Sequence, residues 1–282
     1  MSTKQHFGGS WTVEKLNILS DYLNAYATAL KNQSFKLIYI DAFAGTGRIR
    51  IGDEENYVEI NGSAKLALMA QESFAEYIFI EKKRKFATEL RERVDNEFPD
   101  RKDRVQILTE DCNDALLKIC ARENWKKARA VVFLDPYAAD VKWETLQALA
   151  ATEAIDVWYL FPFSTATRMM KRRGDIDPTW RAKLNSIFGN NSWESEFYHQ
   201  DHQMNLFDDE PVMVRETDSN ALKTYIEKRL RTVFPRVSPN SRVLYNSCNS
   251  PFFLFCFAVS SKNERAQELA LKIANHILKN KK

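Results

Sequence analysis

The stretch KLIYIDAFAGTG, residues 36–47, joins an apolar run to two closely spaced glycines. The run predicts a buried strand at about 37–43, because strands covered on both faces of a parallel sheet are almost continuously apolar. Gly45 and Gly47 follow it in a chain with only eight glycines among 282 residues, whereas average usage would give about 20. Such a cluster indicates a backbone that turns tightly or approaches a ligand closely.

Four more apolar strands alternate with helices after this stretch. The predicted strands are EYIFIEK, RVQILTED, RAVVFLDPY and AIDVWYLFPF, at residues 76–82, 104–111, 129–137 and 154–163. Apolar residues at helical spacing predict helices between them, and an amphipathic helix at 12–30 precedes the first strand. Strands separated by helices imply a parallel sheet with right-handed crossovers.

The last part of the chain has a different pattern. Residues 164–234 show helical periodicity and a polar stretch, and no strand is predicted there. The strands RVLYNS (242–247) and FFLFCFAVS (252–260) are so close that they allow only a hairpin, which makes the last strand antiparallel to its neighbour. A helix ends the chain.

This order of elements predicts the fold class. We expect an α/β, Rossmann-like class I methyltransferase fold, with a mostly parallel seven-stranded sheet and an antiparallel terminal hairpin. A dehydrogenase-type Rossmann fold would instead have a sixth parallel strand. Residues 1–282 are predicted to form a single domain, with a helical and polar insertion at 164–240 before the last two strands.

Composition narrows the classes of function. The chain is 44% apolar, and its 41 basic and 38 acidic residues leave a net charge of +3, which excludes a histone-like polycation. The longest apolar run, Phe252–Val259, is far shorter than the roughly 20 residues that span a bilayer. The opening MSTKQHFGGSW has no apolar signal core, so we expect a cytoplasmic protein with no membrane contact. The four cysteines lack zinc-type spacing, which predicts reduced thiols and no metal site.

Glycines and acidic residues stand at the predicted carboxyl ends of the strands, where open α/β sheets bind ligands. A G-x-G turn exposes backbone N–H groups, Glu81 could accept hydrogen bonds from a ribose diol, and Asp111 from an amine such as adenine N6. Arg50 occupies the position of the third glycine of a dinucleotide-binding motif, which favours a nucleoside without phosphates. S-adenosylmethionine fits that description, and the residues predicted to bind it are Asp41, Phe43, Ala44, Gly45, Gly47, Glu81 and Asp111. The alternative interpretation is that each acidic residue only caps a helix.

The fourth predicted strand ends in Asp135-Pro136-Tyr137, which resembles the D/N-P-P-Y motif of amino-methyltransferases acting on adenine or cytosine. In that motif the first side chain and a proline carbonyl accept hydrogen bonds from the target amine, and the aromatic ring stacks on the flipped base. We therefore predict Asp135, Pro136 and Tyr137 as catalytic residues that act by positioning. One proline is missing, so Tyr137 could instead pack under the next helix. Lys15, on the leading helix, could meet the cofactor carboxylate or lie at the surface.

Longer blocks resemble a known family. KLIYIDAFAGTG, GSAKLAL, YIFIEK, VVFLDPY, IDVWYLFP and FLFCFAVS are similar to blocks of the three-Cys-motif partner protein (TcmP) family, over most of the chain from Trp11 to the last helix. That family is regarded as methyltransferase-like. The resemblance implies a partner, a radical-SAM-like three-Cys-motif protein, whose cysteines rather than those of this chain give the family its name.

Charge is distributed unevenly. Residues 165–185 hold six basic and two acidic residues, and residues 223–242 hold six basic and one acidic. Either segment could bind the phosphates of a nucleic acid, or be a solvated helix face. Between them, Gln203-Met204-Asn205-Leu206-Phe207 resembles the Q-x-x-L-F peptide that docks on bacterial sliding clamps; its apolar pair could instead anchor the loop to the domain.

Three functions are compatible with these observations. The leading prediction is an S-adenosylmethionine-dependent methyltransferase acting on an amino group of nucleic acid or of a partner-associated substrate. The second is a non-catalytic methyltransferase-like module serving the three-Cys-motif partner or a DNA complex. A metal-dependent nuclease using the strand-end carboxylates is disfavoured, because a nucleoside already accounts for them.

Overall fold

The strand β1 (Lys36–Asp41) lies inside the sheet, and its side chains alternate between two apolar layers. In the computed structural model, Leu37 and Tyr39 pack into one core, and Ile38 and Ile40 pack into the other. Such a strand is buried on both faces, which explains its continuous apolar run. The structure describes residues 10–52, 57–200, 213–215 and 218–280.

The central sheet has the order β5-β4-β1-β6-β7-β12-β10, and β11 also pairs with β12. Its strands β5, β4, β1, β6 and β7 are parallel, whereas β12 is antiparallel to β7, β10 and β11. The bounds of the other strands are β4 Glu76–Ile80, β5 Val105–Leu108, β6 Ala128–Leu134, β7 Ile155–Phe161, β10 Arg236–Val237, β11 Arg242–Tyr245 and β12 Pro251–Val259. The chain order reverses between β1 and β6, which is where open α/β sheets leave a crevice for ligands.

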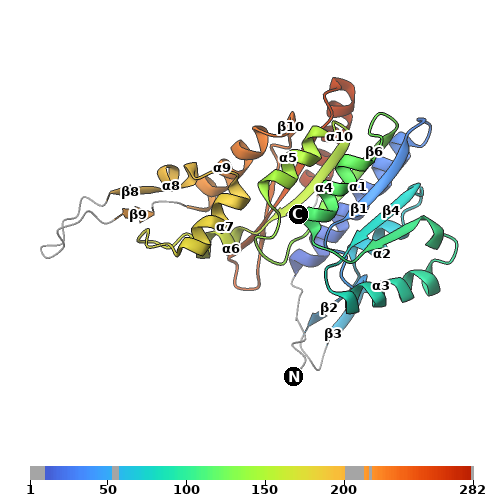
Figure 1. The fold of residues 1–282 in the computed structure, drawn as a ribbon, viewed down its shortest axis with the longest axis horizontal. Helices are drawn as coiled ribbons and strands as arrows, with labels where there is room; N and C mark the ends of the chain where they lie inside the picture. Colours follow the sequence, from blue (N-terminus) through green and yellow to red (C-terminus); the bar gives the residue numbers. More distant parts are fainter. Residues whose placement is uncertain (1–9, 53–56, 201–212, 216–217, 281–282) are drawn as a thin grey trace, which may run out of the picture.

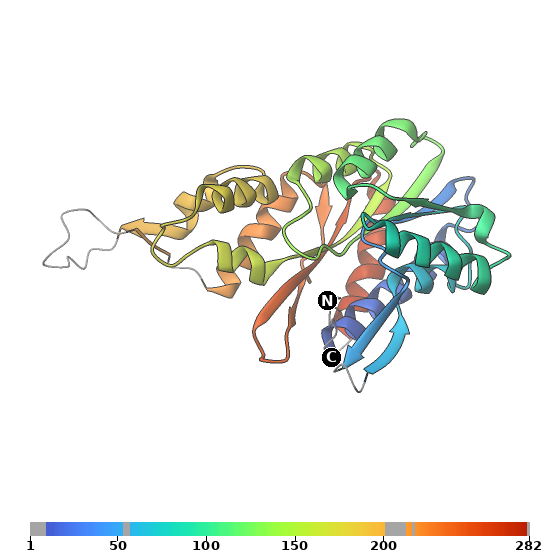
Figure 2. The ribbon, with the colours of Figure 1, turned by 60° about the horizontal axis from the view of Figure 1, so that its bottom comes forward.

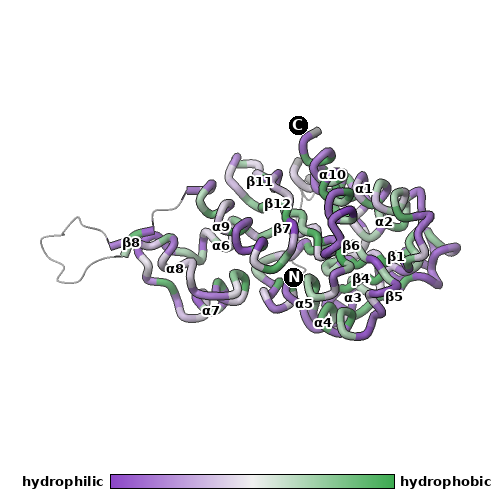
Figure 3. The backbone as a smooth tube through the Cα atoms, turned by 90° about the horizontal axis from the view of Figure 1, so that it is seen from above, coloured by the Kyte–Doolittle hydropathy of each residue, from purple (hydrophilic) through white to green (hydrophobic). Residues whose placement is uncertain are grey.

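Helices cover both faces of the sheet and make a three-layer structure (Figures 1 and 2). One core contains residues of α1 (Ser10–Leu30), α2 (Ser63–Leu68), α3 (Arg84–Glu97) and α10 (Glu264–Asn280). The opposite core contains residues of α4 (Cys112–Arg122), α5 (Trp143–Ala151), α6 (Phe163–Met169), α7 (Pro178–Phe188), α8 (Ser192–Phe197) and α9 (Ser219–Arg231). A 3-10 turn at Lys102–Arg104 precedes β5. In Figure 3, the green colour along β7 and β12 marks the hydrophobic residues of these strands.

The predicted fold class is confirmed, and each predicted strand and its flanking helices are present. The structure adds a hairpin of β2 (Arg48–Gly52) and β3 (Tyr57–Asn61) between the glycine turn and α2. It also adds β8 (Tyr198–Gln200) and β9 (Met213–Arg215), which pair with each other. The prediction of no strand within 164–234 was therefore wrong, because three-residue strands are too short to show a period.

The helices α6, α7, α8 and α9 lie together at one end of the sheet, beyond β7 and β12 (Figure 1). They fall within the range predicted for an insertion, and the description of that range as an insertion into one domain stays a prediction. None of the helices that the structure describes is both long and apolar enough to cross a membrane.

Candidate functional site

The glycine turn after β1 uses a backbone conformation that glycine adopts freely. Gly45 and Gly47 have φ angles of 58° and 76°, a left-handed geometry that costs other residues about 1–2 kcal/mol. The Gly62 N–H donates to the Gly47 carbonyl at 2.9 Å, and a Cβ on Gly62 would stand 3.0 Å from the Gly47 carbonyl carbon. A third glycine therefore lets the start of α2 close against the turn, which lies at the carboxyl edge of the sheet.

Glu81, which follows β4 directly, is buried and holds this turn. Its Oε2 accepts a hydrogen bond from the Gly45 N–H at 3.1 Å, and its Oε1 accepts one from the Lys83 N–H at 2.7 Å. Each carboxylate oxygen can accept a second hydrogen bond. Glu81 thus fixes the turn and retains acceptor capacity for the hydroxyl groups of a ligand.

Asp41, the last residue of β1, is completely buried among hydrogen-bond donors. Its Oδ1 accepts from the Phe43 N–H at 3.2 Å, its Oδ2 accepts from the Tyr39 hydroxyl at 3.4 Å, and Ser63 also hydrogen-bonds it. Burial raises the pKa of Asp41 to about 7; these hydrogen bonds oppose the shift, and the nearby charge of Asp135 adds to it. A carboxyl poised between two protonation states near neutral pH is typical of functional sites.

Asp111 precedes α4 and caps its amino end. Its Oδ1 accepts from both the backbone N–H and the side-chain amide of Asn113, each at 3.0 Å, and its Oδ2 accepts from Lys82 at 3.2 Å. Burial acts to raise the pKa of Asp111, but these hydrogen bonds outweigh it and lower the pKa. The cap that sequence reasoning offered as the alternative is therefore present, on a carboxylate that stays ionised and partly exposed.

Asn113 joins the loops that follow β5 and β6, and sequence reasoning missed it. Besides Asp111, its amide donates to the Asp140 carbonyl at 2.9 Å, and its Oδ1 accepts from the Lys142 N–H at 2.9 Å and the Thr145 hydroxyl at 2.8 Å. This buried side chain ties the predicted adenine-binding residue to the loop that carries Asp135. The available signal was an asparagine two residues after a helix-capping aspartate.

Lys15 of α1 is only 4% exposed and forms an ion pair with Oδ2 of Asp135. Its Nζ also lies 4.7 Å from the centre of the Trp11 ring, a cation–π contact from the same helix. The interpretation of Lys15 as a surface residue was therefore wrong. The Asp135 side chain remains 21% exposed, so its carboxylate still reaches the carboxyl edge.

Pro136 is buried, whereas Tyr137 is 44% exposed. A Cβ on Gly45 would stand 3.9 Å from the Tyr137 hydroxyl, so Tyr137 lies over the glycine turn. Packing under the next helix, the alternative considered for this ring, does not occur. Desolvation of the hydroxyl and the nearby carboxylates of Glu81, Asp135 and Asp41 raise the pKa of Tyr137 well above its ordinary value.

Three residues near the turn point elsewhere. Ala44 is buried in the core that α1 covers, so only its backbone faces the turn, and Phe43 packs partly against the opposite core. Arg48 forms ion pairs with Glu59 at 2.8 Å and Glu97 at 2.9 Å, which directs its guanidinium away from the turn.

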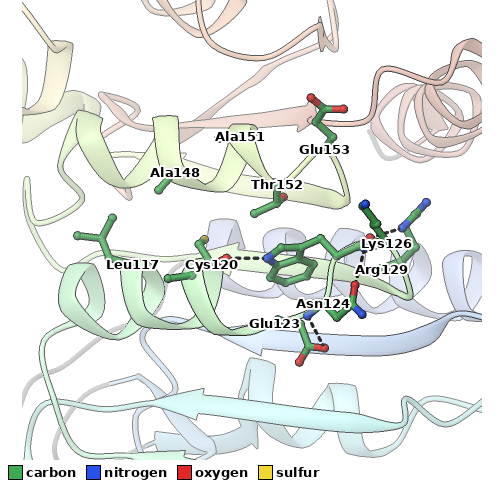
Figure 4. Close-up of a pocket in the computed structure, with 12 residues that line it drawn as sticks. Leu117, Cys120, Glu123, Asn124, Lys126, Arg129, Ala148, Ala151, Thr152 and Glu153 are labelled. Carbon is green, nitrogen blue, oxygen red and sulfur yellow. Dashed lines mark hydrogen bonds between the residues drawn. The ribbon is translucent and has the colours of Figure 1, made fainter.

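A surface hollow of about 780 Å³ lies at the opposite edge of the sheet (Figure 4). It is lined by Leu117, Cys120, Trp125, Ala148 and Thr152, from α4, α5 and the loops before β6 and β7. Burial raises the pKa of the Cys120 thiol to about 12, so the hollow has no reactive thiolate there. The carboxyl edge, where the glycine turn meets the carboxylates, is therefore the better candidate site despite this hollow.

Other sequence features bear less on the site. All four cysteines are free thiols, and the part of the chain that the structure describes has no group of three or more His, Cys, Asp or Glu residues that could hold a metal ion. The clamp-like peptide Gln203–Phe207 lies outside the described residues.

No protein-family model and no curated protein matches this chain. Several solved structures resemble it at low sequence identity. A Legionella pneumophila protein has 9% identity and a TM-score of 0.47, over 93% of this chain and 91% of that one. Trm1 from Pyrococcus horikoshii, in complex with S-adenosyl-L-methionine, has 10% identity and a TM-score of 0.45, over 96% of this chain and 59% of its own. Spermidine synthase from Thermotoga maritima has 12% identity and a TM-score of 0.43, over 94% of this chain and 62% of its own. The strand order and the antiparallel β12 give the chain a Rossmann-like methyltransferase fold, and the distant likenesses add nothing to it.

Proposed function

We propose that the protein is an S-adenosylmethionine-dependent methyltransferase that acts on an amino group. The observation that carries the proposal is the contact of Glu81 with the Gly45 N–H, at the strand switch point. It couples a buried carboxylate with spare acceptor capacity to a turn that has no side chain at Gly45 and Gly47. That combination suits the ribose diol of a nucleoside without phosphates.

The residues present fit such a cofactor. Glu81 would accept from the ribose hydroxyls, and Asp111, ionised and partly exposed, from the adenine amine. Gly45 and Gly47 leave the turn open to the methionine portion, and Asp41 would lie beneath it, held by the Phe43 backbone N–H. When bound, the cofactor supplies an electrophilic methyl group.

Asp135 and Pro136 are proposed to orient the substrate amine. Lys15 occupies only Oδ2 of Asp135, so Oδ1 can accept a hydrogen bond from the amine, and the Pro136 carbonyl can accept a second. This directs the nitrogen lone pair, which is the contribution that positioning makes to methyl transfer. Tyr137, exposed above the turn, would stack on a flat substrate.

The family resemblance adds a second candidate. If the protein is a TcmP-type partner of a radical-SAM-like three-Cys-motif protein, it could serve that protein, or a DNA complex, without catalysis. A cytoplasmic location and docking of Gln203–Phe207 on a sliding clamp belong to the same group of proposals. Cofactor binding separates a catalyst from a non-catalytic module.

Isothermal titration calorimetry with S-adenosylhomocysteine tests the proposal. We expect binding by the parent protein and a roughly 10- to 100-fold weaker affinity for Glu81→Gln, because one charge-assisted acceptor becomes a donor. Glu92→Gln, the same change at an exposed position of α3, is the control and should bind normally. A parent protein that gives no binding heat favours the non-catalytic module. Normal binding by Glu81→Gln would mean that this turn does not hold the cofactor.

A further inference from the structure

A basic loop lies just beyond the candidate site. We use this name for residues 168–173, which run from the end of α6 and contain Arg168, Lys171, Arg172 and Arg173. All four side chains are exposed. Lys171 lies 3.5 Å from Asp175, whereas the three arginines have no acidic partner among the residues that the structure describes. Three guanidinium groups are therefore available to bind a polyanion.

The backbone of the basic loop is held in place by the short hairpin of β8 and β9. Arg215 of β9 donates through its side chain to the carbonyls of Thr167 at 2.9 Å and Met170 at 2.6 Å, and through its N–H to that of Arg172 at 2.8 Å. The Tyr198 hydroxyl of β8 donates to the Lys171 carbonyl at 2.7 Å. The loop thus has a fixed backbone and outward-facing charges, which is the arrangement of a binding surface.

Two connections place the basic loop beside the acceptor residues. The helix α6 begins at Phe163, directly after β7, and β7 is the parallel neighbour of the strand that ends before Asp135. At about 1.5 Å per residue, Arg168 is about one and a half turns from the sheet edge. Lys183 of α7 also reaches Asp140, in the loop after Asp135, at 3.6 Å.

An exposed aromatic ring accompanies these charges. Trp180, near the start of α7, is 37% exposed, and the Nζ of Lys171 lies 5.8 Å from its ring centre. Proteins that bind single-stranded nucleic acids combine these two features: bases stack on the aromatic ring while phosphates pair with the cations.

The second basic segment, 223–242, is less available for binding. Arg229 packs over the Trp143 ring at 4.7 Å and donates to the Phe188 carbonyl, and Arg231 lies 3.3 Å from Glu227. Arg242 forms an ion pair with Glu14. Arg229 and Arg242 hold α9 and β11 to other elements, and Arg231 pairs within α9, so the two basic segments are not equivalent.

We propose that the basic loop binds the phosphate backbone of a nucleic acid strand and delivers a base amine to Asp135. This inference deepens the proposed function and depends on it for the role of substrate; the binding surface itself can be tested separately. Arginine pairs with phosphates bidentately. The substrate class would then be nucleic acid rather than a small metabolite.

Fluorescence anisotropy with labelled single-stranded DNA and RNA oligonucleotides of about 20 nucleotides tests the surface. The perturbation is Arg172→Ala with Arg173→Ala. Losing two phosphate contacts should reduce the salt slope of log K by about 1.4 and weaken binding about 25-fold near 0.1 M salt. The control, Lys126→Ala with Lys127→Ala, removes the same charge from exposed positions at the opposite edge and should bind like the parent protein.

The outcomes distinguish this inference from the proposed function when S-adenosylhomocysteine binding is measured on the same proteins. A loss of oligonucleotide binding that is confined to the arginine variant, with S-adenosylhomocysteine binding intact, supports the inference. Equal losses in both double variants indicate attraction by overall charge and overturn it. If the parent protein binds S-adenosylhomocysteine but neither oligonucleotide, the inference is overturned and the proposed function is not. This holds even if the protein binds anionic vesicles. Parent protein that binds oligonucleotide through the arginines but not S-adenosylhomocysteine supports the surface and overturns the proposed methyltransferase.

Discussion

Replacing Asp41 by Asn should make the protein more stable at alkaline pH. Asp41 is buried, and its pKa is raised to about 7 from an ordinary value of 3.8. The folded state therefore resists ionisation of this carboxyl, which the unfolded chain ionises freely. Asn has no charge to bury, and its oxygen can still accept from the Phe43 N–H. Its amide can donate to the hydroxyl oxygens of Tyr39 and Ser63, which accept as well as donate.

The sign and size follow from proton linkage. A carboxyl whose pKa is raised in the folded state favours folding most when it is protonated, so the parent protein loses stability as pH rises from about 4 to about 7. At 1.36 kcal/mol per pKa unit, this pKa shift lowers the free energy of unfolding of the parent protein by about 4 kcal/mol over the whole pH range of the two titrations. From about pH 5 to about pH 8, the free energy of unfolding of the variant should rise by roughly 3 kcal/mol relative to that of the parent.

Urea unfolding of both proteins at these two pH values measures the difference. The pH dependence is more informative than the absolute value, because any packing cost of Asn is the same at both pH values. Asp156, a second buried carboxyl with its pKa raised to about 7, is present in both proteins and cancels. A stability difference that does not change with pH, or that shrinks as pH rises, would refute the reasoning.

Two further substitutions test the packing around the site. Lys15→Met should lower the free energy of unfolding by about 1–3 kcal/mol, less than for a fully buried pair because Asp135 is partly exposed. Adding Asp135→Asn should recover part of that loss. If the effects of the two substitutions on urea unfolding are strictly additive, the two side chains are not directly coupled. Gly189→Ala should destabilise by more than about 3 kcal/mol, because Gly189 has a φ of 77° and a Cβ there would stand 2.2 Å from Trp143; a thermal midpoint close to the parent's would contradict this.

The main fold could be predicted because its strands carry their own signal. The runs that became β1, β6, β7 and β12 are apolar on both faces and are bounded by turn signals: Asp135 follows β6, Pro162 follows β7, and Pro251 begins β12. The β2–β3 hairpin also had a signal that was not used, since Arg48-Ile49-Arg50-Ile51 alternates charged and apolar residues. β8 and β9 had none, because they are defined by pairing with each other.

The candidate site was only partly predictable. Strand ends converge by topology, so Asp41, Glu81 and Asp111 could be assigned to one edge from order alone. The burial of Lys15 could not be predicted, because its partner is 120 residues away and the approach depends on how α1 packs. The same holds for Tyr137, whose position over the glycine turn depends on the loop that Asn113 ties down.

The contact of Trp11 with Phe252 and Phe253, at ring separations of 5.4 and 5.2 Å, has a consequence for biosynthesis. These rings seat the first turn of α1, the helix that carries Lys15, on a strand made late in translation. At about 5–20 residues per second, the ribosome needs roughly 6 to 24 seconds to travel from Asp135 to Phe253. During that interval the nascent chain has its glycine turn and its carboxylates, but it lacks the support that brings Lys15 to Asp135.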